Sequence, residues 1–513
     1  MRFAGEKPTR QRFSVLAGVM LLLTLWELAG RAHLADGFVL TPAEAVRPLL
    51  DDPRVYRRAA EATFTAAAKG LLYGGGLAVL AALIADQVPP LRASADRVAA
   101  LANSAPWVAV GPVVLLVAGS GAGPVAIAAI AVFFLIFVGT ARGLAASPRA
   151  AHEWFTSLGA GRFRRLLTLQ VPRSLPLVVE GLKLAAPAAL AGAVFGEWYG
   201  AERGLGVLLV GGMRNARPEP LWAAALLCAA GGLAAYGALA LIGLLLRRWF
   251  GSTIAGHEPP SRPHPVRTVV EATLFVVVLV GAWQAWITLG EVSPLVAPGP
   301  QRVFDDLRGD PGAYLAAVGH TGVTAGLGLA IGGGLAVLLA VLCWWSAVVA
   351  GIAVPGLVLM AATPLVALFP LFARVFGYSG GTVVVITSVM VLLPGFVYTR
   401  AGLAAAVAGH RDMARAFGAD RRSLFTSVVV PSALPHLATG LRIAAGSSVV
   451  AAVVAESLIG RAGLGVDFTY AYSLLKMPRA FGSALVIVAV SLVVFALFGR
   501  LERLVHRRFS PAP

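Results

Sequence analysis

The sequence predicts an all-α polytopic membrane protein with about 12 transmembrane helices, built as two parallel six-helix repeats. The first observation is the composition: 58% of the 513 residues are hydrophobic and only 13% are charged, whereas about 25% of the residues of a soluble domain are charged. The second observation is that one half of the chain repeats the other at a nearly constant offset, which indicates an internal duplication.

Each half contains six apolar runs that offer most of the roughly 20 residues needed to cross a ~30 Å hydrocarbon core. In the first half they lie near 14–30, 66–85, 107–118, 124–141, 184–196 and 221–246. In the second half they lie near 268–289, 323–343, 348–372, 382–399, 443–459 and 482–499. Six spans return the chain to its starting side, so the second repeat enters the membrane in the same orientation as the first.

The duplication is clearest in a stretch that occurs at 152–206 and again at 411–465. The first copy contains Gly159-Ala160, Pro172, Pro176, Gly181, Glu197 and Gly204-Leu205-Gly206. The second copy contains, each 259 positions later, Gly418-Ala419, Pro431, Pro435, Gly440, Glu456 and Gly463-Leu464-Gly465. The run Gly74–Leu80 also recurs letter for letter at 332–338. Chance would not keep one register over so many landmarks, so the halves are related copies.

The boundary between the copies is expected at residues 251–267, a proline-rich polar linker that should be stiff. It divides the chain into a first six-span domain, 1–250, and a second, 268–513. The N-terminal run after Arg12 has the form of a signal peptide. Its counterpart at 268–289 cannot be one, so we expect an uncleaved first span.

The formal net charge of +17 is explained by membrane topology, because the basic residues lie between apolar runs and form no nucleic-acid-binding domain. If the N-terminus is cytoplasmic, the segments on the inside carry 25 of the 42 Lys and Arg residues and those on the outside carry 14. This bias has the direction of the positive-inside rule. The expected partners are therefore a lipid bilayer and other proteins, and no nucleic acid.

A short amphipathic segment precedes a Gly-Ala turn in each copy of the repeated stretch. Glu153 and Asp412 lie six positions before Gly159 and Gly418. Glycine suits a helix end that requires a positive φ. The segment is too short to span a membrane, so it either rests on the bilayer surface or docks into a partner.

The repeated stretch resembles the cytoplasmic "EAA" coupling loop of ABC importer permeases, in particular the family that moves sulfonates, taurine, nitrate and thiamine-precursor pyrimidines. An acidic residue six positions before Gly-Ala, followed by Leu/Val-Pro-x-x-x-Pro-x-x-x-x-Gly, fits both copies. The resemblance implies the type I ABC importer permease fold and docking of each loop into a groove of an ATPase subunit. The coupling residues that it implies are Glu153, Gly159, Ala160, Arg162, Asp412, Gly418, Ala419 and Arg421.

The resemblance also implies the partners: two cytoplasmic ABC ATPase subunits and an extracytoplasmic substrate-binding protein, in a bacterial plasma membrane with both termini cytoplasmic. ATP and Mg²⁺ would bind to the partner subunits, and no cofactor is expected on this chain. None of the four lysines follows a glycine, so the G-x-x-x-x-G-K-[ST] loop that cradles phosphates is absent from the sequence. The chain is therefore expected not to be an enzyme, and no metal site is predicted.

Two prolines are candidates for the translocation path because broken helices at matching positions of two repeats can mark a substrate path. They are Pro106 and Pro364, offset by 258. A proline removes a backbone donor and bends its helix, so kinks that only shape the packing are an equally good interpretation.

Two pairs of charged residues in the fifth span of each half are further candidates for the path or its gate. Lys183 and Arg442 either extend toward the cytoplasmic interface or attract an anionic substrate. Glu197 and Glu456 lie 14 residues further on, roughly 21 Å along a helix. They either belong to an outer gate or docking point, or cap the Gly-Leu-Gly turn that follows.

The function that the resemblance implies is that of a fused ABC importer permease, which carries a small solute that is either an anion of the sulfonate, nitrate or taurine type or a pyrimidine. The alternative is a secondary transporter of six-plus-six architecture, driven by an ion gradient. That alternative predicts charged residues deep in the membrane, and this chain has few. An integral membrane enzyme is disfavoured because no nucleophile, base or metal cluster is assembled in the sequence.

Overall fold

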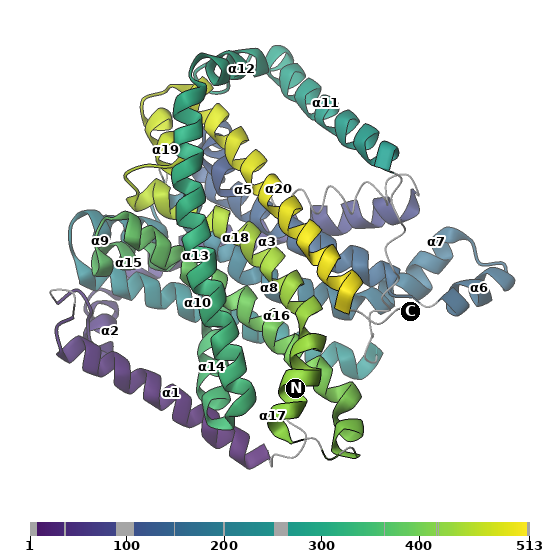
Figure 1. Ribbon diagram of the computed structural model, residues 1–513. Coiled ribbons are helices and arrows are strands. Elements are labelled where there is room, and N and C mark those ends of the chain that lie inside the picture. The colour runs from purple at the N-terminus through teal and green to yellow at the C-terminus, as the bar shows by residue number, and fades with distance from the viewer. Residues whose placement is uncertain are drawn as a thin grey trace.

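The computed structural model describes residues 8–34, 37–88, 107–147, 149–198, 201–250, 265–363, 365–416, 418 and 420–509. All regular elements among these residues are helices (Figure 1). This confirms the predicted all-α class.

The first half contains α1 (Pro8–Arg31), α2 (Pro42–Asp51), α3 (Pro53–Gln87), α5 (Trp107–Ala145), α6 (Arg149–Ser157), α7 (Arg162–Arg165), the π-helical turn η1 (Leu166–Gln170), α8 (Val171–Trp198), α9 (Leu205–Arg214) and α10 (Pro218–Phe250). The second half contains α11 (Pro265–Leu289), α12 (Pro300–Gly309), α13 (Pro311–Trp345), α14 (Ala347–Ala362), the 3-10 turn η2 (Leu365–Leu368), α15 (Phe369–Phe376), α16 (Gly380–Ala416), α17 (Arg421–Leu424), the π-helical turn η3 (Phe425–Val429), α18 (Val430–Ile459), α19 (Leu464–Ser473) and α20 (Met477–Phe509). The boundaries repeat with the sequence: α13 begins 258 positions after α3 (311 minus 53), and α19 begins 259 after α9 (464 minus 205).

Eight helical segments are long and apolar enough to cross a membrane, within the residues that the structure describes. They are Pro53–Gln87, Gly121–Ala145, Arg162–Trp198, Pro218–Leu246, Pro311–Trp345, Gly380–Ala404, Arg421–Ile459 and Met477–Phe509. Shorter apolar helices at Val276–Leu289 and Ala347–Ala361 fall within two further expected spans, and α1 covers the expected first span. The chain is thus a multi-pass membrane protein.

The structure differs from the expected spans in one region of each half. The runs 107–118 and 124–141 lie on a single helix, α5, although glycines and Pro124 separate them. In a bilayer an unwound segment would leave backbone groups unpaired, which favours a continuous helix. Transmembrane helices tolerate Gly and Pro because neighbouring groups satisfy the few backbone groups that these residues free. The matching run 348–372 is instead broken into α14, η2 and α15. The expected linker lies largely outside the described residues, because only its last three residues are in α11.

The long helices of each half cross where a glycine admits the partner's backbone. A Cβ atom on Gly74 of α3 would clash with the carbonyl oxygen of Ala129 in α5. A Cβ atom on Gly332 of α13 would clash with the carbonyl oxygen of Ser388 in α16. Membrane helices pack through such close contacts between small residues, so the repeated glycine run fixes the same crossing in both halves.

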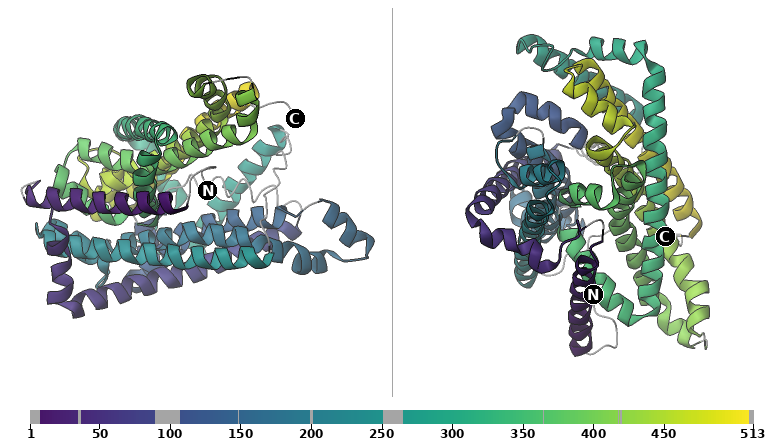
Figure 2. Two further views of the ribbon diagram at one scale, coloured as in Figure 1. Left: turned by 90° about the horizontal axis from the view of Figure 1, so that it is seen from below. Right: turned by 90° about the vertical axis from the view of Figure 1, so that its left-hand side faces the viewer.

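The two halves exchange elements across their interface. Helix α1 of the first half packs on α14 of the second, while α14, η2 and α15 pack against α8, α9 and α10 of the first half. Phe369 of α15, which is 1% exposed, belongs to a hydrophobic cluster formed mainly by first-half residues. Both views in Figure 2 show the halves as adjacent bundles with α1 lying across to the second half.

Candidate functional site

The first repeated loop forms two short helices joined by a tight turn. Helix α6 ends in a Schellman motif: the Ala160 N–H donates to the Phe155 carbonyl at 2.9 Å, and the Gly159 N–H donates to the Thr156 carbonyl at 3.0 Å. Gly159 has φ +73°, the left-handed conformation that glycine adopts without strain. Arg165 of α7 donates to the Thr156 hydroxyl, so the two helices are tied to each other.

The tip of this first loop presents apolar side chains to its surroundings. Trp154, Leu158 and Phe163 are 62%, 65% and 69% exposed, and Glu153 and Arg162 are exposed beside them. Helices α6 and α7 project from the body at the end of the α5–α8 bundle opposite α2 (Figures 1 and 2). Exposed aromatic residues on a rigid projection are typical of a protein docking surface.

The second repeated loop keeps the turn but is held differently. Gly418 has φ +72°, and the helix before it is the continuous end of α16 instead of a separate segment. The Arg421 guanidinium donates to the Trp344 and Trp345 carbonyls at 2.8 and 3.0 Å, at the C-terminus of α13. The side chain of Asp412, and Ala419 altogether, lie outside the described residues.

Both loops continue without a break into the fifth span of their half. In each copy a five-residue π-helical turn, η1 or η3, follows the short basic helix and leads directly into α8 or α18. A proline, Pro172 or Pro431, is the second residue of that long helix and cannot donate a backbone hydrogen bond. Each loop is therefore continuous with a span of 37 or 39 residues, Arg162–Trp198 or Arg421–Ile459.

At the far end of α8 a buried carboxylate binds the Gly-Leu-Gly turn. Glu197 is 3% exposed, and it accepts hydrogen bonds from the Thr63 hydroxyl and the Gly206 N–H, both at 2.7 Å. The Thr63 oxygen in turn accepts the Leu205 N–H at 2.8 Å. We call this set of residues the first clamp, because it fixes the start of α9 to α3 and α8.

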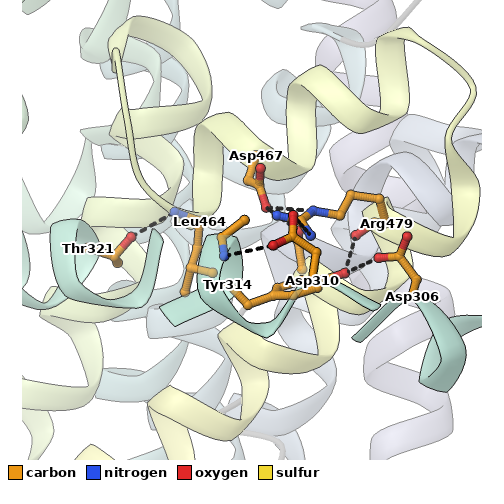
Figure 3. Close-up of polar contacts among 9 residues, drawn as sticks. Asp306, Asp310, Tyr314, Thr321, Leu464, Asp467 and Arg479 are labelled. Carbon is orange, nitrogen blue, oxygen red and sulfur yellow. Dashed lines mark hydrogen bonds and ion pairs between the residues drawn. The ribbon is translucent and has the colours of Figure 1, made fainter. Parts of the chain in front are cut away.

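The second half builds the same clamp at the end of α18. Glu456, 2% exposed, accepts from the Thr321 hydroxyl at 2.8 Å and the Gly465 N–H at 3.1 Å. The Leu464 N–H donates to the Thr321 oxygen at 2.9 Å (Figure 3). The Thr324 hydroxyl adds a further bond to Glu456 at 3.0 Å.

Both glycines of the turn are required by the clamp. A Cβ atom on Gly204, whose φ is +147°, would lie on the Glu197 carboxylate, and one on Gly206 would lie on the Val194 carbonyl oxygen. In this geometry Glu197 caps the Gly-Leu-Gly turn, which is one of the two interpretations that its sequence position allows. In this conformation neither that carboxylate nor Glu456 is open to contact a partner directly.

The two cations of the fifth span pair with carboxylates of their own half. Lys183 lies 2.5 Å from Glu180, one helical turn away. Arg442 lies 2.8 Å from Glu502 of α20 and stacks over the Phe495 ring at 4.0 Å. The prolines expected in the path, at 106 and 364, lie outside the described residues.

Comparison with known proteins identifies the family of both halves. Residues 74–250 and again 329–511 match the family described as binding-protein-dependent transport system inner membrane component. The chain belongs to this family. The predicted resemblance is thus confirmed, and two permease domains are fused in one chain. Members of the family are transporters.

The permease is similar to several single-domain relatives. It is 30% identical over 237 residues to the formylaminopyrimidine transport permease protein ThiX of Halalkalibacterium halodurans, which covers 46% of this chain and 94% of the relative. It is 24% identical over 240 residues to the putative aliphatic sulfonates transport permease protein SsuC of Bacillus subtilis, covering 46% and 86%. It is 32% identical over 153 residues to the riboflavin transport system permease protein RibX of Chloroflexus aurantiacus, covering 30% and 57%.

Sequence reasoning about the permease missed the partners that lie far away in the chain. Thr63 and Thr321 show only as a repeated threonine, and nothing local indicates that they bind a glutamate more than 130 positions later. A second network also escaped prediction: Arg479 donates to Asp467 of α19 at 3.0 Å and stacks over the Tyr314 ring at 3.8 Å (Figure 3).

Proposed function

We propose that this chain forms the complete translocation path of an ATP-driven importer, with one six-span domain at 1–250 and a second at 268–513. Both loops would face the cytoplasm and dock into two ABC ATPase subunits, which would bind the ATP and Mg²⁺. An extracytoplasmic binding protein would deliver the solute at the far end of the bundle. The membrane would be the bacterial plasma membrane, with both termini cytoplasmic.

The observation that carries this proposal is the first loop. Its apolar tip of Trp154, Leu158 and Phe163 is exposed, and the Schellman turn together with the Arg165–Thr156 bond keeps it rigid. A rigid apolar tip favours docking into a groove over lying loosely in the interface. The helix that leaves this tip is also a membrane span, so a displacement of the docked tip would reach the path.

The solute class is proposed from the relatives, whose names describe carriers of a formylaminopyrimidine, aliphatic sulfonates and riboflavin. We infer a small organic solute, with sulfonates and thiamine-precursor pyrimidines as the first compounds to test. Because Lys183 and Arg442 each pair with a carboxylate, these cations give no reason to prefer an anionic solute over a neutral one.

The experiment that tests the proposal replaces the two turn glycines. In Gly159→Leu/Gly418→Leu both residues must adopt positive φ, at about 1–2 kcal/mol each, and we expect loss of ATPase co-purification and of uptake with normal membrane insertion. Gly161→Leu is the matched control, because Gly161 has a negative φ and open space around its Cβ position.

Two outcomes would contradict the proposal. One is uptake by the double variant equal to that of Gly161→Leu. The other is transport by the purified chain in vesicles that contain an ion gradient but neither ATP nor an ATPase, which would instead support a secondary transporter.

A further inference from the structure

Arg374 of the second half is bonded to α9 of the first half. Arg374 of α15 donates from Nε to the Met213 carbonyl of α9 at 2.7 Å, and its Nη2 donates to the same oxygen. The guanidinium lies 5.5 Å from the centroids of the Phe38 and Tyr378 rings. These distances are within cation–π range of both rings, and two of the guanidinium donors are directed at the end of α9.

The bonded carbonyl is one of the last of its helix, where backbone oxygens lack helical partners and carry partial negative charge. A cation at this position stabilises the helix end. The Phe38 side of the site is also held in place, because the Trp222 indole donates to the Phe38 carbonyl at 2.8 Å. Arg374 therefore connects α15 to the end of α9, beside a segment around Phe38 that is itself hydrogen-bonded to α10.

The sequence of the first half lacks the residue that makes this connection. The position matching Arg374, 258 residues earlier, is Leu116, which cannot donate a hydrogen bond. Helix α19 is instead tied within its own half, by Asp467 and Arg479 (Figure 3). The first-half positions matching these two residues, 259 earlier, are Leu208 and Pro220.

Among the described residues, different side-chain bonds hold α9 and α19. The first clamp fixes the start of α9 to its own half, and Arg374 fixes its end to the opposite half. Helix α19 is bonded in its first turn, where the Leu464 N–H donates to Thr321 and Asp467 accepts from Arg479, and both partners belong to its own half. Separation of the halves at this end would break the Arg374 bond to α9.

We propose that Arg374 is a positioning residue, a latch that holds the two halves together through α9, at the end of the first-half bundle opposite α6 and α7. Its bond to the Met213 carbonyl must break when this end opens. This inference rests on the proposed transport function, because only alternating access requires the far ends to separate.

The test measures the distance across the latch and the activity that it restrains. Spin labels at Gly211→Cys and Phe376→Cys, with Cys228 and Cys343 replaced by alanine, report the separation of α9 from α15. We expect Arg374→Leu to lengthen the mean distance between the labels and to broaden its distribution. We also expect ATP hydrolysis in the absence of binding protein to rise about fivefold, because the loss of one hydrogen bond shifts the two populations by about that factor. Arg374→Lys, which can still reach the carbonyl, should restore most of both values.

Arg479→Leu is the matched control, because it removes an arginine from the tie of α19 and should leave the α9–α15 distance unchanged. An unchanged distance in Arg374→Leu, or an equal change in Arg479→Leu, would overturn the latch. The distance is measured on the chain alone, so it tests the latch whether or not an ATPase associates. Failure of ATPase association would count against the proposed function only.

Discussion

The first clamp yields a prediction whose size follows from the hydrogen bonds. Thr63→Val keeps the shape of the side chain and removes the hydroxyl that bonds Glu197 and the Leu205 N–H. One interhelical side-chain bond contributes about 0.6 kcal/mol in a membrane protein, and a buried N–H left without an acceptor costs about 1–3 kcal/mol. We therefore expect a loss of about 2–4 kcal/mol in the free energy of unfolding.

The assay is denaturant titration in mixed micelles, followed by the fluorescence of the ten tryptophans. Thr140→Val is the matched control, because Thr140 is similarly buried and, among the described residues, its hydroxyl donates to the Ile136 carbonyl of its own helix and to no other helix. If the free energies of unfolding of the two variants differ by less than about 0.6 kcal/mol, the contribution of one interhelical bond, the clamp does not hold α9 and the reasoning fails.

Two further predictions concern packing and charge. Gly74→Ala should lower the free energy of unfolding by about 1–3 kcal/mol, because the new methyl group clashes with the Ala129 backbone. Gly76→Ala places its methyl group in open space and should leave stability unchanged or raise it. Equal thermal stability of the two variants would contradict the close crossing of α3 and α5. Arg442→Met and Glu502→Leu should each destabilise the protein, because each leaves a partly buried charge without its partner. The double variant should recover most of the loss, and simple addition of the two losses would show that the residues do not act as a pair.

The sequence predicts well those features that are local or repeated. The two Gly-Ala turns are predictable because Gly159 and Gly418 recur in a fixed context, and the duplication predicts matching helix boundaries. The pairing of Thr63 with Glu197 is not predictable, because it joins helices 134 positions apart and depends on how α3 and α8 pack. Nor is the difference between the unbroken α5 and the broken α14–α15 segment, because both runs carry prolines and glycines.

The unbroken helix from Arg162 to Trp198 has a mechanical consequence. At ~1.5 Å per residue, its 37 residues form a rod roughly 55 Å long. In the proposed complex the end near Arg162 would dock into an ATPase subunit, and the end near Trp198 carries the Glu197 carboxylate that holds α9. Tilting a rod of this length by only about 5° about its inner end would sweep the outer end through roughly 5 Å, comparable to one helical turn. In the proposed complex, a small tilt imposed at the docked end would thus produce a much larger displacement at the end that holds α9.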